Sequence, residues 1–403
     1  MLMMSDTMDN QIIYREWPLW IYAQREKDIS DSIQKFTDKP SKREKWMARN
    51  LMPYLFHGDE PLFTGIERAA VFYRAYHSMN MITKDGSNRV LYKWGDDIKG
   101  VYYSKLTPKH IISLDEIKKI QQEIDNNFIS CLPPGSWHIH FSFTLSKPYI
   151  SRDDTDFYII DNPVKKEWVF KVPYVAPSQW KGALRSAIMQ ELVSNLRNGK
   201  IDEKKFTDER VRLYRLFGNE KDGTGDFLNK ALARYFVRSH PNEGQSEQIN
   251  PETLNSKIKE IAEAFKSELV SRGYKQGDIE GFQGNLHFYP THFNQIGLQV
   301  INPHDRKTGA GKNPIYFECV PEGTNGTFNL LFVPLTGPEL SDDETREDLR
   351  AVARGVKAMM TYYGFGAKTS SGFGTAEVDP ENTIILPDNF KPLWDNGLKD
   401  ENK

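Results

Sequence analysis

The stretch GFGAKTSSGFG, residues Gly364–Gly374, decides how the rest of the sequence is interpreted. It follows an amphipathic segment, 342–363, that predicts a helix, and it leads into a short predicted strand, 375–378. Glycine permits positive φ angles and lets a ligand approach the backbone closely. The stretch combines such residues with side-chain donors that suit phosphate oxygens. The predicted phosphate-binding residues are Gly364, Gly366, Lys368, Thr369, Ser370, Ser371, Gly372 and Gly374.

Two other interpretations of this loop explain less of it. A Walker loop or a dinucleotide fingerprint runs in the order strand, loop, helix, whereas the order here is helix, loop, strand. A simple turn in which Gly364 ends the preceding helix accounts for that one glycine. It leaves the other three glycines, interleaved with Lys and Ser, unexplained.

A second segment with basic side chains lies upstream, at the start of a helix predicted over 178–196. Ser178 is the expected N-cap, and Lys181 and Arg185 fall in the first two turns. The helix dipole disfavours cations at this end and favours anions. Two cations one turn apart are therefore expected to hold a phosphate together with the free N–H groups. The alternative is that both side chains simply extend into water.

A third segment, 151–164, contains four carboxylates and suggests general-base or metal chemistry. Asp161 differs from the other three because it follows Phe157-Tyr158-Ile159-Ile160 and precedes Asn162-Pro163. We expect the others to be solvated and Asp161 to be held at a loop tip.

Together, and in this order, the three segments resemble the RAMP superfamily of CRISPR-associated proteins. The glycine loop resembles G-x-G-x-x-x-S-x-G-aromatic-G, and Val175–Arg185 resembles I-P-G-S-S-x-K-G-x-x-R, with Ala176-Pro177 and Gln179 departing from it. Asp161–Val164 is similar to the D-[SL]-P-[VI] of the backbone subunits. Further similarities are Leu216–Gly218 to L-F-G, and Val300–His304 with Asn313–Phe317 to a run in the capping subunit.

The resemblance, over about residues 136–379, implies an α+β fold: an RRM/ferredoxin-like core with insertions. It implies that the loop and the helix carrying Ser178, Lys181 and Arg185 contact CRISPR RNA, while guide RNA reads the target by base pairing. The implied partners are CRISPR RNA, target RNA and other subunits of a type III interference complex. Asp161 would cleave target RNA, with a divalent ion, Mg²⁺ or Mn²⁺, whose ligands the resemblance does not identify.

Two functions stay open at this point: a ribonuclease subunit, and a non-catalytic RNA-binding capping or assembly subunit. An unrelated enzyme of RRM-like fold acting on a phosphate ligand is a third. One carboxylate can assist cleavage because RNA carries its own nucleophile, the 2′-OH. The sequence contains no further catalytic constellation.

The predicted domain organisation has three parts. Residues 1–132 form a helix-rich region of unknown role, 133–380 the RRM-like domain with an insertion of long loops at about 199–253, and 381–403 a polar tail. A strand at 137–144 places His138 and His140 on one face. Such a pair can bind zinc, but without a third ligand in register we interpret it as a polar strand face.

Composition excludes several classes of protein. With 53 basic and 55 acidic residues the net charge is −2, so any affinity for nucleic acid must come from local charge. Two cysteines make neither a disulfide framework nor a cysteine-rich zinc site, and a reducing cytoplasm fits best. No apolar run is long enough to cross a membrane, so no membrane association is expected.

Overall fold

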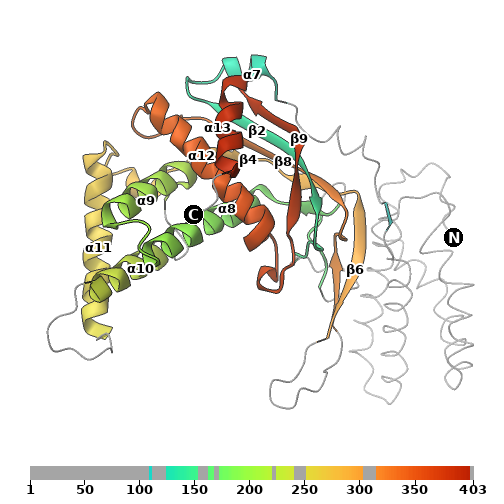
Figure 1. Cartoon of the computed structure of the whole chain (residues 1–403), viewed down its shortest axis with the longest axis horizontal. Helices are drawn as coiled ribbons and strands as arrows, with labels where there is room; N and C mark the ends of the chain where they lie inside the picture. The colour runs from blue at the N-terminus through green and yellow to red at the C-terminus, as the bar shows by residue number, and fades with distance from the viewer. Residues whose placement is uncertain are drawn as a thin grey trace, which may run out of the picture. The chain divides into compact units, whose positions relative to one another are not determined.

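The computed structural model describes residues 109–110, 124–152, 162–167, 172–219, 224–239, 251–302 and 315–399. Two compact units make up the chain. The first comprises Met1–Leu114, Ile150–Pro173 and Asn294–Pro321, and the second comprises Asp115–Tyr149, Tyr174–Phe293 and Glu322–Lys403. Figure 1 shows the described elements coloured along the chain. The residues predicted as a helix-rich N-terminal region lie outside the described part, except for 109–110 and 124–132.

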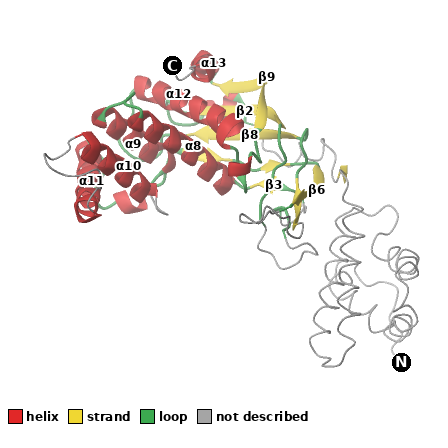
Figure 2. Ribbon diagram, turned by 60° about the horizontal axis from the view of Figure 1, so that its bottom comes forward, coloured by secondary structure: helices red, strands yellow, loops and turns green. Residues whose placement is uncertain are grey.

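The second unit is built on a four-stranded antiparallel sheet with the order β4-β8-β2-β9. Along the chain the core runs strand, helix, two strands, helix, strand. Its members are β2 (Trp137–Leu145), α8 (Pro177–Arg197), β4 (Leu286–Phe288), β8 (Asn325–Phe332), α12 (Asp342–Ala358) and β9 (Ala376–Leu386). This order and topology are those of a ferredoxin-like fold, which confirms the predicted fold class. Figure 2 shows α8 and α12 on one side of the strands.

Buried apolar and more polar side chains alternate along β2, and this pattern explains why the segment forms a strand with one face in the core. Its odd-numbered side chains, from Trp137 to Leu145, are at most 1% exposed. They face the helices: Phe143 meets Trp180 of α8 edge-on at 6.0 Å between ring centroids, and Phe141 stacks on Phe328 of β8 at 5.0 Å. A strand with one apolar face fixes its own register, because a one-residue slip would expose that face.

The opposite face of β2 is polar, as expected from its histidines. Nε2 of His138 is hydrogen-bonded to Oδ1 of Asn329 on β8. Burial lowers the pKa of His138 to about 4, so the imidazole is neutral at neutral pH. Within the described ranges no group of three or more His, Cys, Asp or Glu side chains is arranged to hold a metal ion.

The segment between α8 and β4, predicted as an insertion or long loops up to about residue 253 and a helix after it, is mostly helical where the structure describes it. It contains α9 (Glu203–Phe217), α10 (Thr224–Ser239), α11 (Pro251–Ser271) and a short 3-10 turn, Ile279–Gly281. The inner faces of α9 and α11 form a separate apolar cluster with two residues that follow α11. Its members are Val211, Tyr214, Phe265, Leu269, Tyr274 and Ile279. The amphipathic spacing of Leu254, Ile261 and Leu269 predicts a helix in this region, and α11 confirms it.

A buried ion-pair network joins this insertion to the core. Arg215 of α9 donates two hydrogen bonds to Asp348 of α12, at 2.8 and 2.6 Å, and Nε of Arg212 donates a third at 3.1 Å. Burial raises the pKa of Asp348, and both arginines oppose this shift. The network holds α12 in place, and α12 leads directly into the glycine loop.

The predicted polar tail is instead part of the fold. β9 continues to Leu386, and α13 (Lys391–Lys399) packs against α12. Trp394 is fully buried against Phe141, and a Cβ on Gly397 would lie 2.7 Å from that of Ala353. The sequence of this segment is mostly polar, and Trp394 is the large apolar side chain that attaches it to the core.

Smaller elements complete the description. The first unit contains the antiparallel sheet β1-β6-β7, made of Lys109–His110, Gln295–Ile301 and Ile315–Cys319. The second unit also contains α7 (Asn126–Ser130) and the paired strands β3 (Tyr174–Val175) and β5 (Thr291–His292). Among the helices that the structure describes, none has the length and apolar character to cross a membrane.

Candidate nucleic-acid interface

The glycine loop closes into a tight turn on the end of β2. The Phe365 N–H donates to the Gly374 carbonyl at 2.9 Å, and the Gly374 N–H donates to the Pro148 carbonyl at 3.0 Å. A Cβ on Gly374 would lie 1.9 Å from the Phe365 carbonyl oxygen, so only glycine fits there. Part of the glycine content is therefore required to build the loop, whatever the loop binds.

An aromatic anchor fixes the loop to the helix that carries the cations. Phe365 is fully buried, with its ring centroid 4.5 Å from Trp180 and 5.7 Å from Tyr149. Trp180 stands directly before Lys181, and Tyr149 donates its hydroxyl hydrogen to Oε1 of Gln179 at 2.8 Å. The first turn of α8 and the glycine loop are thus a single packed assembly.

The remainder of the loop is directed outward and rich in donors. Lys368 is exposed and has a φ of 59°, the only positive value of a non-glycine residue in the described part. Thr369–Ser371 form a 3-10 turn in which Ser370 and Ser371 are exposed. Gly372 follows with a φ of 84°, and a Cβ there would meet nothing within 4 Å. This open end can accept an oxyanion without steric hindrance.

The start of α8 carries two cations, and no carboxylate of the described residues pairs with either. Ala176 occupies the N-cap, where its side chain makes no hydrogen bond, and Pro177 opens the helix. Ser178 is therefore not the cap as predicted but an exposed residue of the first turn. Lys181 and Arg185 are half-buried, and within the described residues neither forms an ion pair with a carboxylate. Arg212, Arg215 and Arg272, in contrast, all do.

Burial and the charge of Arg185 lower the pKa of Lys181. The charge of Lys181 in turn adds to the effect of burial in lowering the pKa of His287 on β4. Among the described residues, no negative charge therefore compensates the repulsion between these groups, and a bound phosphate would relieve it.

We expect Lys181→Gln to raise the free energy of unfolding of the RNA-free protein at pH 7, by a few tenths of a kcal/mol after solvent screening. The sign follows from the lowered pKa: the folded state holds the ammonium charge less readily than the unfolded chain, so that charge opposes folding. The difference should shrink as pH rises from the lowered pKa towards 10.5, where wild type also loses the charge. Urea denaturation at pH 7 and pH 10 measures this, and a less stable variant at pH 7 would contradict it.

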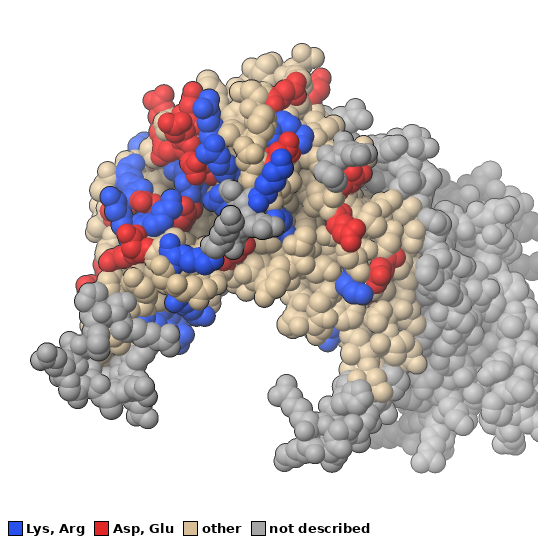
Figure 3. All heavy atoms as spheres, in the orientation of Figure 1, with Lys and Arg blue, Asp and Glu red and all other residues tan. Residues whose placement is uncertain are grey.

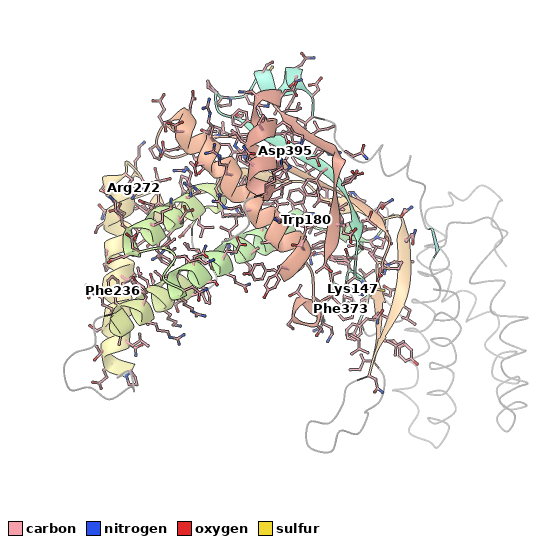
Figure 4. All side chains as sticks on the ribbon, viewed as in Figure 1. Lys147, Trp180, Phe236, Arg272, Phe373 and Asp395 are labelled. Atoms are coloured by element: carbon pink, nitrogen blue, oxygen red, sulfur yellow. The ribbon has the colours of Figure 1, made fainter. Side chains whose placement is uncertain are left out.

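Lys147 is a candidate contact that the sequence did not indicate. Its backbone N–H donates to the Thr375 carbonyl at 3.3 Å, directly after the loop. Figure 4 shows Lys147 and Phe373 at the same end of the molecule. Its side chain is 60% exposed and 3.5 Å from the equally exposed Glu322, a weak surface pair. Only the pairing of β2 with β9, which sequence patterns do not reveal, brings it to the loop.

Charges elsewhere on the protein are mixed. On the face shown in Figure 3, Lys and Arg lie among Asp and Glu over α9, α11 and α12. Many are paired within or between these helices, as Lys205 is with Glu209 and Arg350 with Glu347. Lys181 and Arg185 of α8, which pair with no carboxylate in the described part of the chain, therefore differ from the paired charges of these helices.

Asp161, the predicted catalytic residue, lies outside the described residues, but the segment that follows it is held firmly in the first unit. Asn162 accepts a hydrogen bond from the Glu318 N–H at 3.0 Å and donates one to the Tyr316 carbonyl at 3.1 Å, both on β7. The Val164 N–H donates to the Glu318 carboxylate, which also pairs with the buried Lys166. The segment is therefore anchored one residue after Asp161.

Fold and site together define a class: a ferredoxin-like protein with two cations at a helix start that packs against a glycine-rich loop. The model of the RAMP superfamily matches residues 155–377, more than half of the 403 residues. The chain belongs to the RAMP superfamily.

The comparisons with solved structures and with curated proteins do not identify the function further. A solved structure described as the cryo-EM structure of the type III-B Cmr-beta bound to cognate target RNA contains a chain that is 14% identical. The match covers 81% of this chain and 93% of that one, with a TM-score of 0.39. No curated protein matches the sequence.

Proposed function

We propose that this protein is a CRISPR RNA-binding subunit of a type III interference complex. In this proposal the outward half of the glycine loop and the start of α8 hold the backbone of the guide RNA. The observation that carries it is the pair Lys181 and Arg185, which lack acidic partners in the described structure and adjoin a loop rich in donors. Membership of the RAMP superfamily supports the same assignment.

The double variant Lys181→Ala/Arg185→Ala tests the proposal. We expect affinity for single-stranded guide RNA to fall about 10- to 100-fold, because two charge-assisted contacts to phosphate are lost. The slope of log K against log[salt] should become shallower by about 1.4, since each phosphate contact on a single strand contributes about 0.7. Fluorescence anisotropy over a salt series measures both quantities.

Lys259→Ala/Lys266→Ala is the matched control, because it removes the same charge from exposed positions on α11. Its affinity and slope should stay near those of wild type. If both double variants behave alike, net charge rather than a built interface governs binding, and the assignment fails. Wild-type protein purified from its host with no repeat-derived RNA would instead favour an enzyme acting on a small phosphate ligand.

The proposal also assigns target-RNA cleavage to Asp161. The carboxylate would take the proton from a 2′-OH as that oxygen attacks the adjacent phosphorus. The P–O5′ bond then breaks, and the departing 5′ oxygen takes a proton from water. Support comes from the anchoring of Asn162 and Val164 on β7, which holds the chain next to Asp161 in one place. A divalent ion, Mg²⁺ or Mn²⁺, held by Asp161 would stabilise the negative charge that develops on the phosphate, and the step above is not routed through it.

A further inference from the structure

An unusually exposed aromatic side chain stands immediately before the glycine loop. Tyr362 is 78% exposed, more than the other large hydrophobic side chains noted on the described surface, of which Leu335 at 65% comes next. Isolated exposed apolar residues are common and need no special explanation. Tyr362 differs because its position is produced by a local change in helix geometry at the candidate interface.

The last turn of α12 widens into a π-helix, Met359–Tyr363. The Gly364 N–H closes this turn with a hydrogen bond to the Met359 carbonyl at 2.8 Å. Met359 and Met360 are fully buried, whereas Thr361 and Tyr362 are turned to solvent. Single π-turns are rare within α-helices and occur frequently at functional sites.

The ring of Tyr362 is also supported from one side. Tyr363 is half-buried and meets it edge to face, with ring centroids 5.0 Å apart and an interplanar angle of 87°. Burial raises the pKa of Tyr363, and the charge of Glu191 on α8 adds to this, so the supporting phenol is neutral at physiological pH. At 78% exposure, most of the Tyr362 ring remains open to a ligand.

The open ring lies within reach of a nucleotide bound at the loop. Tyr362 precedes Gly364 by two residues, which span at most about 7 Å, and a Cβ on Gly364 would lie 3.3 Å from Cγ2 of Thr369 in the loop. A base attached to a backbone held by the loop donors would therefore be close to the ring. Sequence-tolerant binding of single strands combines cations along the backbone with aromatic side chains on which bases stack.

We propose that Tyr362 is a stacking platform for one unpaired nucleobase of the RNA whose backbone lies at the glycine loop. This inference rests on the proposed function, because it requires RNA at that loop. Stacking uses the face of the base and makes no hydrogen bonds to its edge, so the contact tolerates all four bases. Tyr362 thereby fixes where along the strand a base is turned towards the protein.

The test compares Tyr362→Ala, Tyr362→Phe and Tyr362→Trp in the full-length protein. The probe is a single-stranded guide RNA with 2-aminopurine placed at successive positions, whose fluorescence falls when the base stacks. We expect Tyr362→Ala to weaken binding about 5- to 100-fold and to abolish quenching at one position. Tyr362→Phe and Tyr362→Trp should keep both, and Leu335→Ala, a similarly exposed apolar residue, should change neither.

The salt dependence separates this inference from the proposed function. Tyr362→Ala removes no phosphate contact, so its log–log salt slope should equal that of wild type, in contrast to Lys181→Ala/Arg185→Ala. If the cation variant binds weakly while Tyr362→Ala binds and quenches like wild type, the stacking role is wrong and the proposed function stands. If wild type itself binds no RNA, both are overturned.

Discussion

We expect Asp161→Ala to abolish cutting of target RNA opposite this subunit while guide binding and assembly stay intact. Of the predictions made here, this one has the largest effect on activity. The rate should fall about 10²–10⁴-fold, the usual contribution of a general base. Affinity should stay nearly unchanged because the carboxylate is used only in the transition state. The assay is a reconstituted complex with divalent metal and labelled complementary RNA, with product positions mapped.

Two further variants sharpen this experiment. Asp161→Asn keeps the size of the side chain and removes its basicity, so it should lose as much activity as Asp161→Ala. Asp154→Ala removes a carboxylate from the same acidic segment and should cut at the wild-type rate. Cutting by Asp161→Ala at every position at the wild-type rate would make Asp161 structural. The non-catalytic assembly subunit would then be the better description of this chain.

The core of the fold was predictable because its signals are local and periodic. The strict alternation of Trp137–Thr144 sets one face of β2 against the helices, and it could be read directly from the sequence. Ser341 and Glu344 form a capping box at the start of α12, where both reciprocal hydrogen bonds are present. Such patterns need only the neighbouring residues to be recognised.

Segments stabilised by distant partners were less predictable. The charged residues of the insertion left its structure open between an inserted element and long loops. Arg215 is charged and still buried against Asp348, 133 positions away. Trp394 stands in a polar segment and becomes part of the core only when α13 meets α12 and β2. Neither partner is visible in a local window of sequence.

In the candidate interface, too, local features were predictable from the sequence and long-range contacts were not. The clustering of glycines and donors marked the loop, but their division into structural and accessible positions required the backbone path. Nothing local in the sequence marks Phe365 and Trp180 as partners, and the structure makes them the connection between loop and helix. Tyr362 gave no signal in the sequence, because its exposure results from the π-turn that precedes Gly364.

Gly374→Ala should destabilise the protein far more than Gly372→Ala, although the two glycines stand two residues apart and both have positive φ angles, 70° and 84°. At Gly374 an added Cβ would lie 1.9 Å from the Phe365 carbonyl oxygen and 3.0 Å from its carbon. The backbone must move, which breaks the hydrogen bonds that join Gly374 to Phe365 and Pro148. We expect the free energy of unfolding to fall by about 3 kcal/mol or more.

At Gly372 the added Cβ meets nothing, so only the left-handed backbone conformation is penalised, at about 1 kcal/mol. The loop should still fold. If the binding free energy for RNA falls by more than this conformational penalty, the extra loss measures how far the methyl group displaces a phosphate from the open end. Thermal and urea denaturation give the two stabilities, and anisotropy with single-stranded guide RNA gives the affinities. Equal destabilisation by both substitutions would show that Gly374 does not form the base of the loop, and that the separation of structural from ligand-facing glycines is wrong.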